Sequence, residues 1–151
     1  MKVTQGDLIK KAKEGKFDLI VHGCNCFCTM GGGIAKGIKK EFPKAFDADQ
    51  ATPKGSKEKL GTCSFAKIEQ KGIHLIVVNA YTQFDYRGKG EKVDYDAVRS
   101  CMKWIKENFE GKRIGLPRIG AGLAGGDWER ISQIIDKELA GEDVTLVEYK
   151  P

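Results

Sequence analysis

The sequence has no apolar run that approaches the roughly 18 residues of a membrane-spanning helix. It also lacks the pattern of a secretory signal peptide. The content of hydrophobic residues, 40%, and of charged residues, 31%, is that of an ordinary globular protein. These absences exclude a membrane-embedded protein, and we expect a cytoplasmic protein without a membrane partner.

Cysteine and histidine are too few, and wrongly spaced, for a disulfide framework or a zinc site. The five cysteines cannot all pair within one chain, and without a secretion signal reduced thiols are favoured. Cys24, Cys26 and Cys28 alternate along the chain, but no CxxC motif or second Cys/His pair follows at zinc-finger spacing. We therefore expect thiols that pack in the core or in a loop, no metal and no cofactor.

The basic residues do not form the clusters that are found in nucleic-acid-binding modules. The formal net charge of +5 suits a polyanionic partner. However, the lysines are spread between Asp and Glu residues, and there is no arginine-rich arm or aromatic–basic RNA motif. Most of the positive charge is expected to be solvated surface, and a nucleic-acid-binding module is the less favoured alternative.

Apolar runs of strand length alternate with stretches of helical period along the chain. A length of 151 residues fits one compact core, so we expect a single domain, residues 1–151, and a monomer. The alternation predicts an α/β fold with helices on both faces of a mixed sheet. Predicted strands are residues 2–5, 17–21, 62–69, 73–80, 113–117 and 144–149, and predicted helices are residues 6–14, 32–42, 94–108 and 127–139. Residues 45–59, with at most one helical turn, and 81–92 are predicted loops.

Two glycine-rich segments each follow a predicted strand and precede a predicted helix. They are Met30-Gly31-Gly32-Gly33-Ile34 and Arg118-Ile119-Gly120-Ala121-Gly122-Leu123. Neither is a Walker loop or a G-x-G-x-x-G dinucleotide turn. Glycine allows close approach of the backbone to a ligand, and a helix amino terminus presents free N–H groups to anions. Because ligands bind beyond the carboxyl ends of strands in such sheets, the pair predicts one phosphate-binding crevice. The alternative is a pair of tight strand-to-helix turns.

Four segments together resemble the macrodomain family over essentially the whole chain. They are Gly6-Asp7-Leu8, Ile20-Val21-His22-Gly23-Cys24-Asn25, Gly31-Gly32-Gly33-Ile34-Ala35 and Pro117-Arg118-Ile119-Gly120-Ala121-Gly122-Leu123. Within that family they are most similar to the ADP-ribose 1″-phosphate phosphatases, which are grouped with the terminal ADP-ribose protein glycohydrolases. The resemblance implies a three-layer α/β/α macrodomain with a mixed central sheet. It also implies that the protein binds ADP-ribose and its derivatives, with ADP-ribosylated protein or nucleic acid as further partners.

The resemblance also implies which residues bind the ligand. Asp7 would accept the adenine amino group, although an Asp here also suits a helix N-cap. Tyr149 would stack on adenine, with packing at the sheet edge as the alternative. Asn25 would donate to a ribose hydroxyl or hold a water, or else be a turn residue. The implied binding set is completed by Leu8, by Met30, Gly31, Gly32, Gly33 and Ile34 around the distal ribose, and by Ile119, Gly120, Ala121, Gly122 and Leu123 at the diphosphate.

Three residues are candidates for catalysis. A histidine titrates near neutral pH, and His22 falls on the histidine of the phosphatase-like motif, so we expect it to activate water. Asp127 would orient His22 or a water, and Asn25 would assist. The alternatives are a histidine satisfied within the sheet and an Asp that only caps its helix.

The sequence departs from the lysine-dependent glycohydrolases of the family at two places. Asn79-Ala80-Tyr81-Thr82-Gln83 stands where those enzymes have a lysine nucleophile, and Ala124 stands where they have an aspartate. Lys89 and Lys92 could replace that lysine only if residues 81–92 fold over the site. The first hypothesis is therefore hydrolysis of ADP-ribose 1″-phosphate. The alternatives are a hydrolase that removes ADP-ribose from protein or nucleic acid, and a non-catalytic reader of ADP-ribose.

Overall fold

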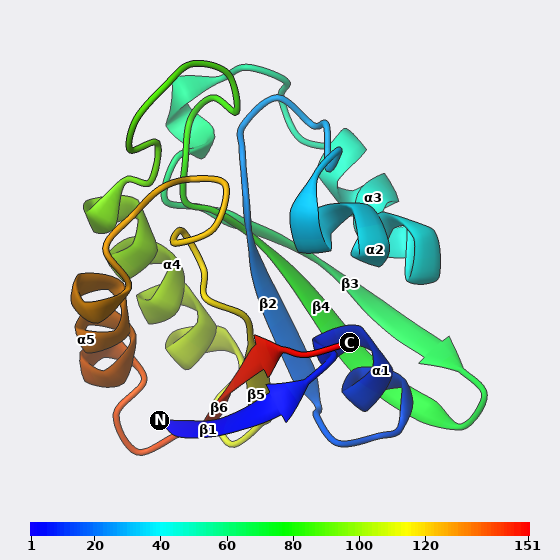
Figure 1. Ribbon diagram of the computed structural model, residues 1–151. Coiled ribbons are helices and arrows are strands. Elements are labelled where there is room, and N and C mark those ends of the chain that lie inside the picture. Colours follow the sequence, from blue (N-terminus) through cyan, green and yellow to red (C-terminus); the bar gives the residue numbers. More distant parts are fainter.

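A six-stranded sheet forms the middle layer of the computed structural model, which describes residues Met1–Pro151 (Figure 1). The strand order is β1-β6-β5-β2-β4-β3, and only the β3–β4 pair is antiparallel. The strands are β1 (Lys2–Gly6), β2 (Leu19–Cys24), β3 (Cys63–Gln70), β4 (Ile73–Tyr81), β5 (Arg113–Leu116) and β6 (Asp143–Tyr149). The predicted mixed sheet is confirmed.

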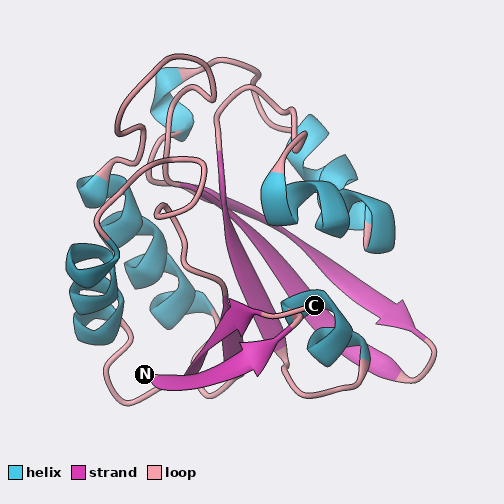
Figure 2. Cartoon of the chain, viewed as in Figure 1, coloured by secondary structure: helices cyan, strands magenta, loops and turns pink.

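Helices cover both faces of this sheet, which confirms the three-layer α/β/α architecture. Figures 1 and 2 show α1, α2 and α3 on one face and α4 and α5 on the other. Their bounds are α1 (Leu8–Lys13), α2 (Gly33–Glu41), α3 (Pro43–Gln50), α4 (Tyr95–Asn108) and α5 (Trp128–Glu138). No helix combines the length and the apolar character that crossing a membrane requires.

Strand β2 contributes side chains to the hydrophobic core on both faces of the sheet. Successive side chains of a strand point to opposite faces. Leu19 and Val21 belong to the cluster beneath α4 and α5, whereas Ile20 belongs to the cluster beneath α1, α2 and α3. A strand that is buried on both sides is apolar throughout, which explains its continuous hydrophobic run.

The turn between β3 and β4 confirms the predicted hairpin. Gln70 pairs with Ile73, so two residues form the turn, and both have a positive φ, 48° at Lys71 and 79° at Gly72. A two-residue turn with positive φ at both positions matches the twist of an antiparallel pair.

Two predictions from the sequence are wrong. Residues 45–59 are not a loop, because Pro43 begins a second helix, α3, as well as ending α2, and a 3-10 helix (Lys57–Lys59) follows. Proline is favoured at the first position of a helix, since its missing N–H has no partner there. The strand predicted over residues 17–21 in fact runs from Leu19 to Cys24, so His22 lies inside β2 and not at its end.

Candidate functional site

The structure brings the two glycine-rich segments together beyond the carboxyl ends of β2 and β5 (Figure 1). A Cβ added at Gly32 would lie 3.1 Å from Leu123 Cδ1, so Leu123 of the second segment covers Gly32 of the first. A Cβ at Gly23, near the end of β2, would lie 3.2 Å from Ile119 Cγ2. The two segments therefore border one site, as predicted.

Both segments present unpaired backbone donors. The N–H groups of Gly31, Gly32, Gly122 and Leu123 donate no hydrogen bond to any atom of the chain. All four residues are exposed, and Leu123 retains 75% of its accessible surface. Successive unpaired N–H groups in turns and at a helix amino terminus form a binding site for an anion. These N–H groups can donate hydrogen bonds to an anionic ligand.

A third loop, residues 82–93, is hydrogen-bonded near one end to Cys26, which precedes the first glycine-rich segment, and at the other end to Ala124, which follows the second. At one end the Cys26 N–H donates to the Phe84 carbonyl at 2.9 Å. At the other end the Lys92 N–H donates to the Ala124 carbonyl at 2.7 Å, and Lys92 Nζ lies 3.5 Å from the Leu123 carbonyl. This loop therefore forms one wall of the site.

Asp7 and Tyr149 lie side by side at the carboxyl ends of β1 and β6. Gly6 pairs with Tyr149 in the sheet, and the Lys150 N–H donates to the Gly6 carbonyl at 2.9 Å. Asp7 caps α1 by accepting the Lys10 N–H at 3.1 Å through Oδ1, which leaves Oδ2 without a hydrogen-bond partner in the chain. Tyr149 is 75% exposed. A free carboxylate oxygen and an exposed ring thus lie next to each other.

Some residues of the predicted binding set have buried side chains. Leu8, Met30 and Ile119 are each at most 3% exposed and pack in or beside the core. Their side chains therefore do not line the surface of the site. Met30 also has a φ of 40°, a left-handed conformation that a side chain rarely adopts.

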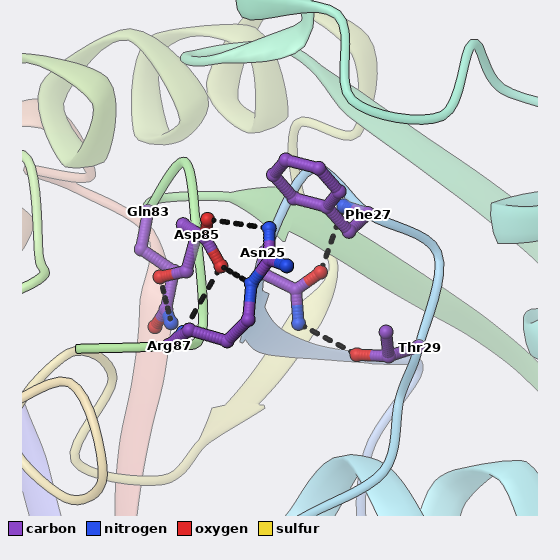
Figure 3. Close-up of polar contacts among 6 residues, drawn as sticks. All are labelled: Asn25, Phe27, Thr29, Gln83, Asp85 and Arg87. Carbon is purple, nitrogen blue, oxygen red and sulfur yellow. Dashed lines mark hydrogen bonds and ion pairs between the residues drawn. The ribbon is translucent and has the colours of Figure 1, made fainter.

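Asn25 holds the loop that leads from β2 to the first glycine-rich segment (Figure 3). Its Oδ1 accepts the Phe27 N–H at 2.8 Å, and its Nδ2 donates to Thr29 Oγ1 at 2.8 Å. These contacts are those of a turn residue. A side-chain amide has two donor hydrogens and two acceptor lone pairs, so each end of Asn25 retains one position for a ligand.

His22 is a core residue, fully buried on the face of β2 that α3 covers. Its Nε2 lies 2.7 Å from Asn79 Oδ1, and Asn79 Nδ2 donates to the Ala45 carbonyl of α3 at 3.0 Å. Burial lowers the pKa of His22 to about 4, although the hydrogen bond to Asn79 opposes that shift. The imidazole is therefore neutral at pH 7 and has no surface from which to reach a substrate, so this geometry does not support direct activation of water by His22.

Asp127 caps α5 on the opposite side of the sheet. Its Oδ1 accepts the Glu129 N–H at 3.0 Å, and its own N–H donates to Tyr95 Oη of α4 at 3.0 Å. No hydrogen bond joins Asp127 to His22, whose partner is Asn79 on the other face of the sheet, so of the two predicted roles only the orientation of a water stays a prediction. Asp127 itself is exposed at the end of the second glycine-rich loop.

A buried polar network holds the loop that carries Cys26 and Cys28. Lys59, 5% exposed, donates to the Cys26 carbonyl at 3.1 Å and lies 3.4 Å from Cys28 Sγ, while Tyr81 Oη donates to Asp49 Oδ1 at 2.7 Å. Burial raises the pKa of the Cys26 thiol to about 11. The Cys26 thiol is therefore protonated at neutral pH. The network holds the chain between β2 and the first glycine-rich segment in place.

Comparison with known proteins identifies the fold family. The family model for the Macro domain matches residues 21–135. The chain belongs to the macrodomain family.

This macrodomain is similar to several relatives with different names, and each similarity extends over most of its length. An uncharacterised 17.5 kDa protein of Enterobacteria phage T4 is 36% identical, over 100% of this chain and 97% of its own. The ADP-ribose 1″-phosphate phosphatase of Candida albicans is 29% identical, over 83% of this chain and 85% of its own. A DNA ADP-ribosyl glycohydrolase of Mycobacterium tuberculosis is 25% identical over 97% of this chain, which spans 41% of that protein. A solved protein of Bacteroides thetaiotaomicron has a TM-score of 0.79 at 28% identity, covering 98% of this chain and 99% of its own.

The positions where this macrodomain lacks a lysine and an aspartate offer no substitute nucleophile. Asn79, Ala80 and Tyr81 are fully buried in β4, and Ala124 is 4% exposed. Of the two lysines considered as replacements, Lys92 is placed against the Leu123 carbonyl, and Lys89 is exposed without an ion pair.

Sequence reasoning missed a group of residues beside Asn25. Figure 3 shows Gln83, Asp85 and Arg87 next to Asn25, Phe27 and Thr29. Arg87 donates from Nε and Nη2 to the two carboxylate oxygens of Asp85, at 3.0 and 2.9 Å, and these bonds lower the pKa of Asp85 to about 2. No local pattern relates Phe27 to Arg87, since 60 residues separate them and only the parallel pairing of β2 with β4 brings their loops together.

Two hollows in the surface of the macrodomain lie away from the glycine-rich segments and from residues 82–93. One, of about 200 Å³, is lined by Met1, Val144 and the end of α5, and the other, of about 440 Å³, by residues that include Asp18 and His74. Both lie at the amino-terminal edge of the sheet and contain none of the residues expected to bind a ligand.

Proposed function

We propose that this macrodomain binds ADP-ribose with its diphosphate between the two glycine-rich segments. The observation that carries the proposal is the set of unpaired N–H groups at Gly31, Gly32, Gly122 and Leu123, in two segments that contact each other. Anions bind to successive backbone N–H groups because each N–H is a hydrogen-bond donor with a partial positive charge. Adenine would lie against Tyr149 with its amino group on Asp7 Oδ2, and the distal ribose would lie beside Asn25.

We further propose that the protein hydrolyses ADP-ribose 1″-phosphate to ADP-ribose and phosphate. The similarity to the phosphatase of Candida albicans over most of both chains supports this choice. So does the absence of a lysine from the buried segment of β4, where the lysine-dependent glycohydrolases carry their nucleophile. The second candidate is release of ADP-ribose from DNA or protein, which the similarity to the mycobacterial glycohydrolase favours.

Within this proposal the three catalytic candidates have different roles. Asn25 would contact the distal ribose or the attacking water directly. Asp127 would act on a water from the end of the second glycine-rich loop with the oxygen that does not cap α5. His22 would act at a distance, as a positioning residue that holds the end of β2 against Asn79 and α3.

Calorimetric titration with ADP-ribose tests binding, and phosphate release from ADP-ribose 1″-phosphate tests turnover. Asn25→Ala should lower kcat/KM at least tenfold, because it removes a positioned hydrogen-bonding group. Asn108→Ala removes an exposed amide from the end of α4 and should leave both measurements unchanged. Tight binding without phosphate release would leave two outcomes. Free ADP-ribose from modified DNA or protein would identify a glycohydrolase, and no product from any of these substrates would identify a reader.

A further inference from the structure

Helices α1 and α2 pack against each other on the same face of the sheet (Figure 1). A Cβ added at Gly37 of α2 would lie 2.8 Å from Ile9 Cδ1 of α1, so Ile9 packs on Gly37. One turn further along both helices, Lys13 Nζ lies 3.0 Å from Glu41 Oε2. Because both contacts join residues that are 28 positions apart, the two helices lie side by side and run in the same direction.

Exposed lysines lie on both sides of this helix contact. Lys10 follows Ile9 on α1, and on α2 Lys36 and Lys40 each precede a residue that contacts α1. Lys36 and Lys40 are four positions apart, so their side chains project from the same side of α2. We name this surface the paired-helix face, and its members are Lys10, Lys13, Lys36 and Lys40. The sequence hides it, because the lysines of the two helices are far apart along the chain.

The net charge of the protein is concentrated around the paired-helix face. Residues 8–44 contain eight lysines, no arginine and three acidic residues, a net charge of +5, which is the formal net charge of the whole chain. The rest of the chain is therefore neutral in sum. Two of the three acidic residues are bound in ion pairs with Lys13 and Arg113, which leaves Glu14 as the free carboxylate of this segment. The other lysines of the face form no ion pair.

The paired-helix face has no apolar or aromatic anchor. The large apolar side chains that are exposed in this protein all lie outside α1 and α2. Phe42 is buried, and Lys39 Nζ covers the ring of Phe46 at 4.1 Å from its centroid. Protein partners are held mainly by aromatic and apolar anchors, single strands by stacking on rings, and membrane surfaces by apolar side chains that insert. The face therefore suits a partner that lysines alone can bind.

Double-stranded DNA is a partner of this kind. It carries one negative charge about every 1.7 Å of its axis, and lysines that meet its phosphates release condensed counterions. Lysines three or four positions apart on a helix have Cβ atoms about 5–6 Å apart, and packed helices lie about 8–10 Å apart, so each ammonium group can reach a different phosphate.

We propose that the paired-helix face binds the phosphate backbone of double-stranded DNA, independently of base sequence and of ADP-ribose. Such a surface holds the protein on a duplex whether or not the duplex is modified. The inference does not rest on the proposed function, because no residue of the face is assigned to the ADP-ribose site.

Fluorescence anisotropy with a labelled DNA duplex of mixed sequence, at several salt concentrations, tests the face. Lys36→Ala combined with Lys40→Ala should raise the dissociation constant about tenfold or more at low salt. The slope of log affinity against log salt should become shallower by about 2, because each lysine that meets a phosphate contributes about 0.9. Lys103→Ala combined with Lys137→Ala is the matched control. It removes the same charge from exposed lysines of α4 and α5 on the opposite face, and should change neither quantity.

The outcomes of this experiment are distinct. All four substituted lysines are exposed, and equal urea midpoints would show that the variants fold. An equal loss of affinity in both double variants, or no loss in either, would overturn the proposal. Tighter binding of wild type to the single strand of the same sequence, to an RNA duplex, to polyglutamate or to phosphatidylserine vesicles would refute the assignment to double-stranded DNA.

Competition with ADP-ribose separates the paired-helix face from the proposed ADP-ribose site. Excess ADP-ribose should not displace the duplex, and calorimetry should give the same dissociation constant for ADP-ribose in wild type and in Lys36→Ala combined with Lys40→Ala. Displacement of the duplex would place the DNA in the crevice and contradict a separate face. If wild type does not bind ADP-ribose while the duplex results hold, the proposed function fails and the paired-helix face stands.

Discussion

The buried imidazole of His22 should make the stability of this macrodomain depend on pH between about pH 6.5 and 4. An unfolded histidine titrates near 6.5, whereas burial lowers the pKa of His22 in the folded protein to about 4. Between these values the unfolded chain binds more protons than the folded chain, so stability rises with pH. The contribution of His22 is fully present above pH 6.5 and is lost as the pH falls through 4.

The size of this contribution follows from the two pKa values. Each pH unit between them corresponds to about 1.4 kcal/mol, so lowering the pH from 7 to 4 should cost about 3 kcal/mol from His22 alone. About 2 kcal/mol of this should already be lost at pH 5. Small domains are stable by about 5–15 kcal/mol, so one side chain should remove a substantial fraction of the total.

Urea unfolding at several pH values, followed by circular dichroism, measures this dependence. His22→Gln removes the titrating group and should flatten the curve between pH 6.5 and 4, even if the variant is less stable at every pH. His74→Gln removes the other histidine, whose side chain is 79% exposed, and serves as the control. Carboxyl groups such as Asp49, whose pKa is raised by burial, contribute equally to all three proteins and cancel in the comparison. The same slope for His22→Gln and wild type would refute the assignment of a buried, neutral imidazole.

Three other variants test the loops. Gly120→Ala should lower the free energy of unfolding by about 1–3 kcal/mol, because Gly120 has a φ of 76° and the new Cβ would lie 2.6 Å from Val93 Cγ2. Gly122→Ala, which meets no atom within 4 Å, should be nearly neutral in the same urea experiment, and an equal loss in both would contradict this account. Tyr149→Ala should raise the calorimetric dissociation constant for ADP-ribose about 5–10-fold without changing stability, since stacking contributes about 1–1.5 kcal/mol and the ring is 75% exposed. Leu123→Ala should weaken the same binding several-fold and leave the urea midpoint in place, and unchanged binding would remove Leu123 from the site.

Features that depend only on residues adjacent in the sequence could be predicted. The hairpin at Lys71-Gly72 requires only the positive φ of two adjacent residues. The contact between the two glycine-rich segments could also be predicted, because each segment follows a strand whose carboxyl end lies at the same edge of the sheet. Helix α3 could not be predicted, because its buried residues are Ala45 and Asp49 and a helix with so little apolar surface shows no hydrophobic period.

The error at His22 arose from the boundary of one strand. A histidine just after a strand would lie in the crevice, whereas β2 continues three residues past Val21 and so places His22 inside the sheet. His22 is two residues from Ile20, so both side chains point to the face of the sheet that α3 covers, whereas Asp127 begins α5 on the opposite face. A partnership across the sheet cannot be predicted from a motif, because it depends on which face each element covers.

The glycine-rich segments and the loop after β4 would contribute to ligand binding in different ways. The diphosphate would be bound by backbone N–H groups, which any sequence that adopts the same turns can supply. The leaving group would be met by side chains of the loop after β4, such as Tyr86 and Arg87, which neither turn geometry nor the core constrains. We therefore expect substrate choice to depend on this loop, while the glycine-rich segments stay the same. It follows that grafting residues 82–93 between two macrodomains should transfer the preference for a leaving group without altering affinity for ADP-ribose itself.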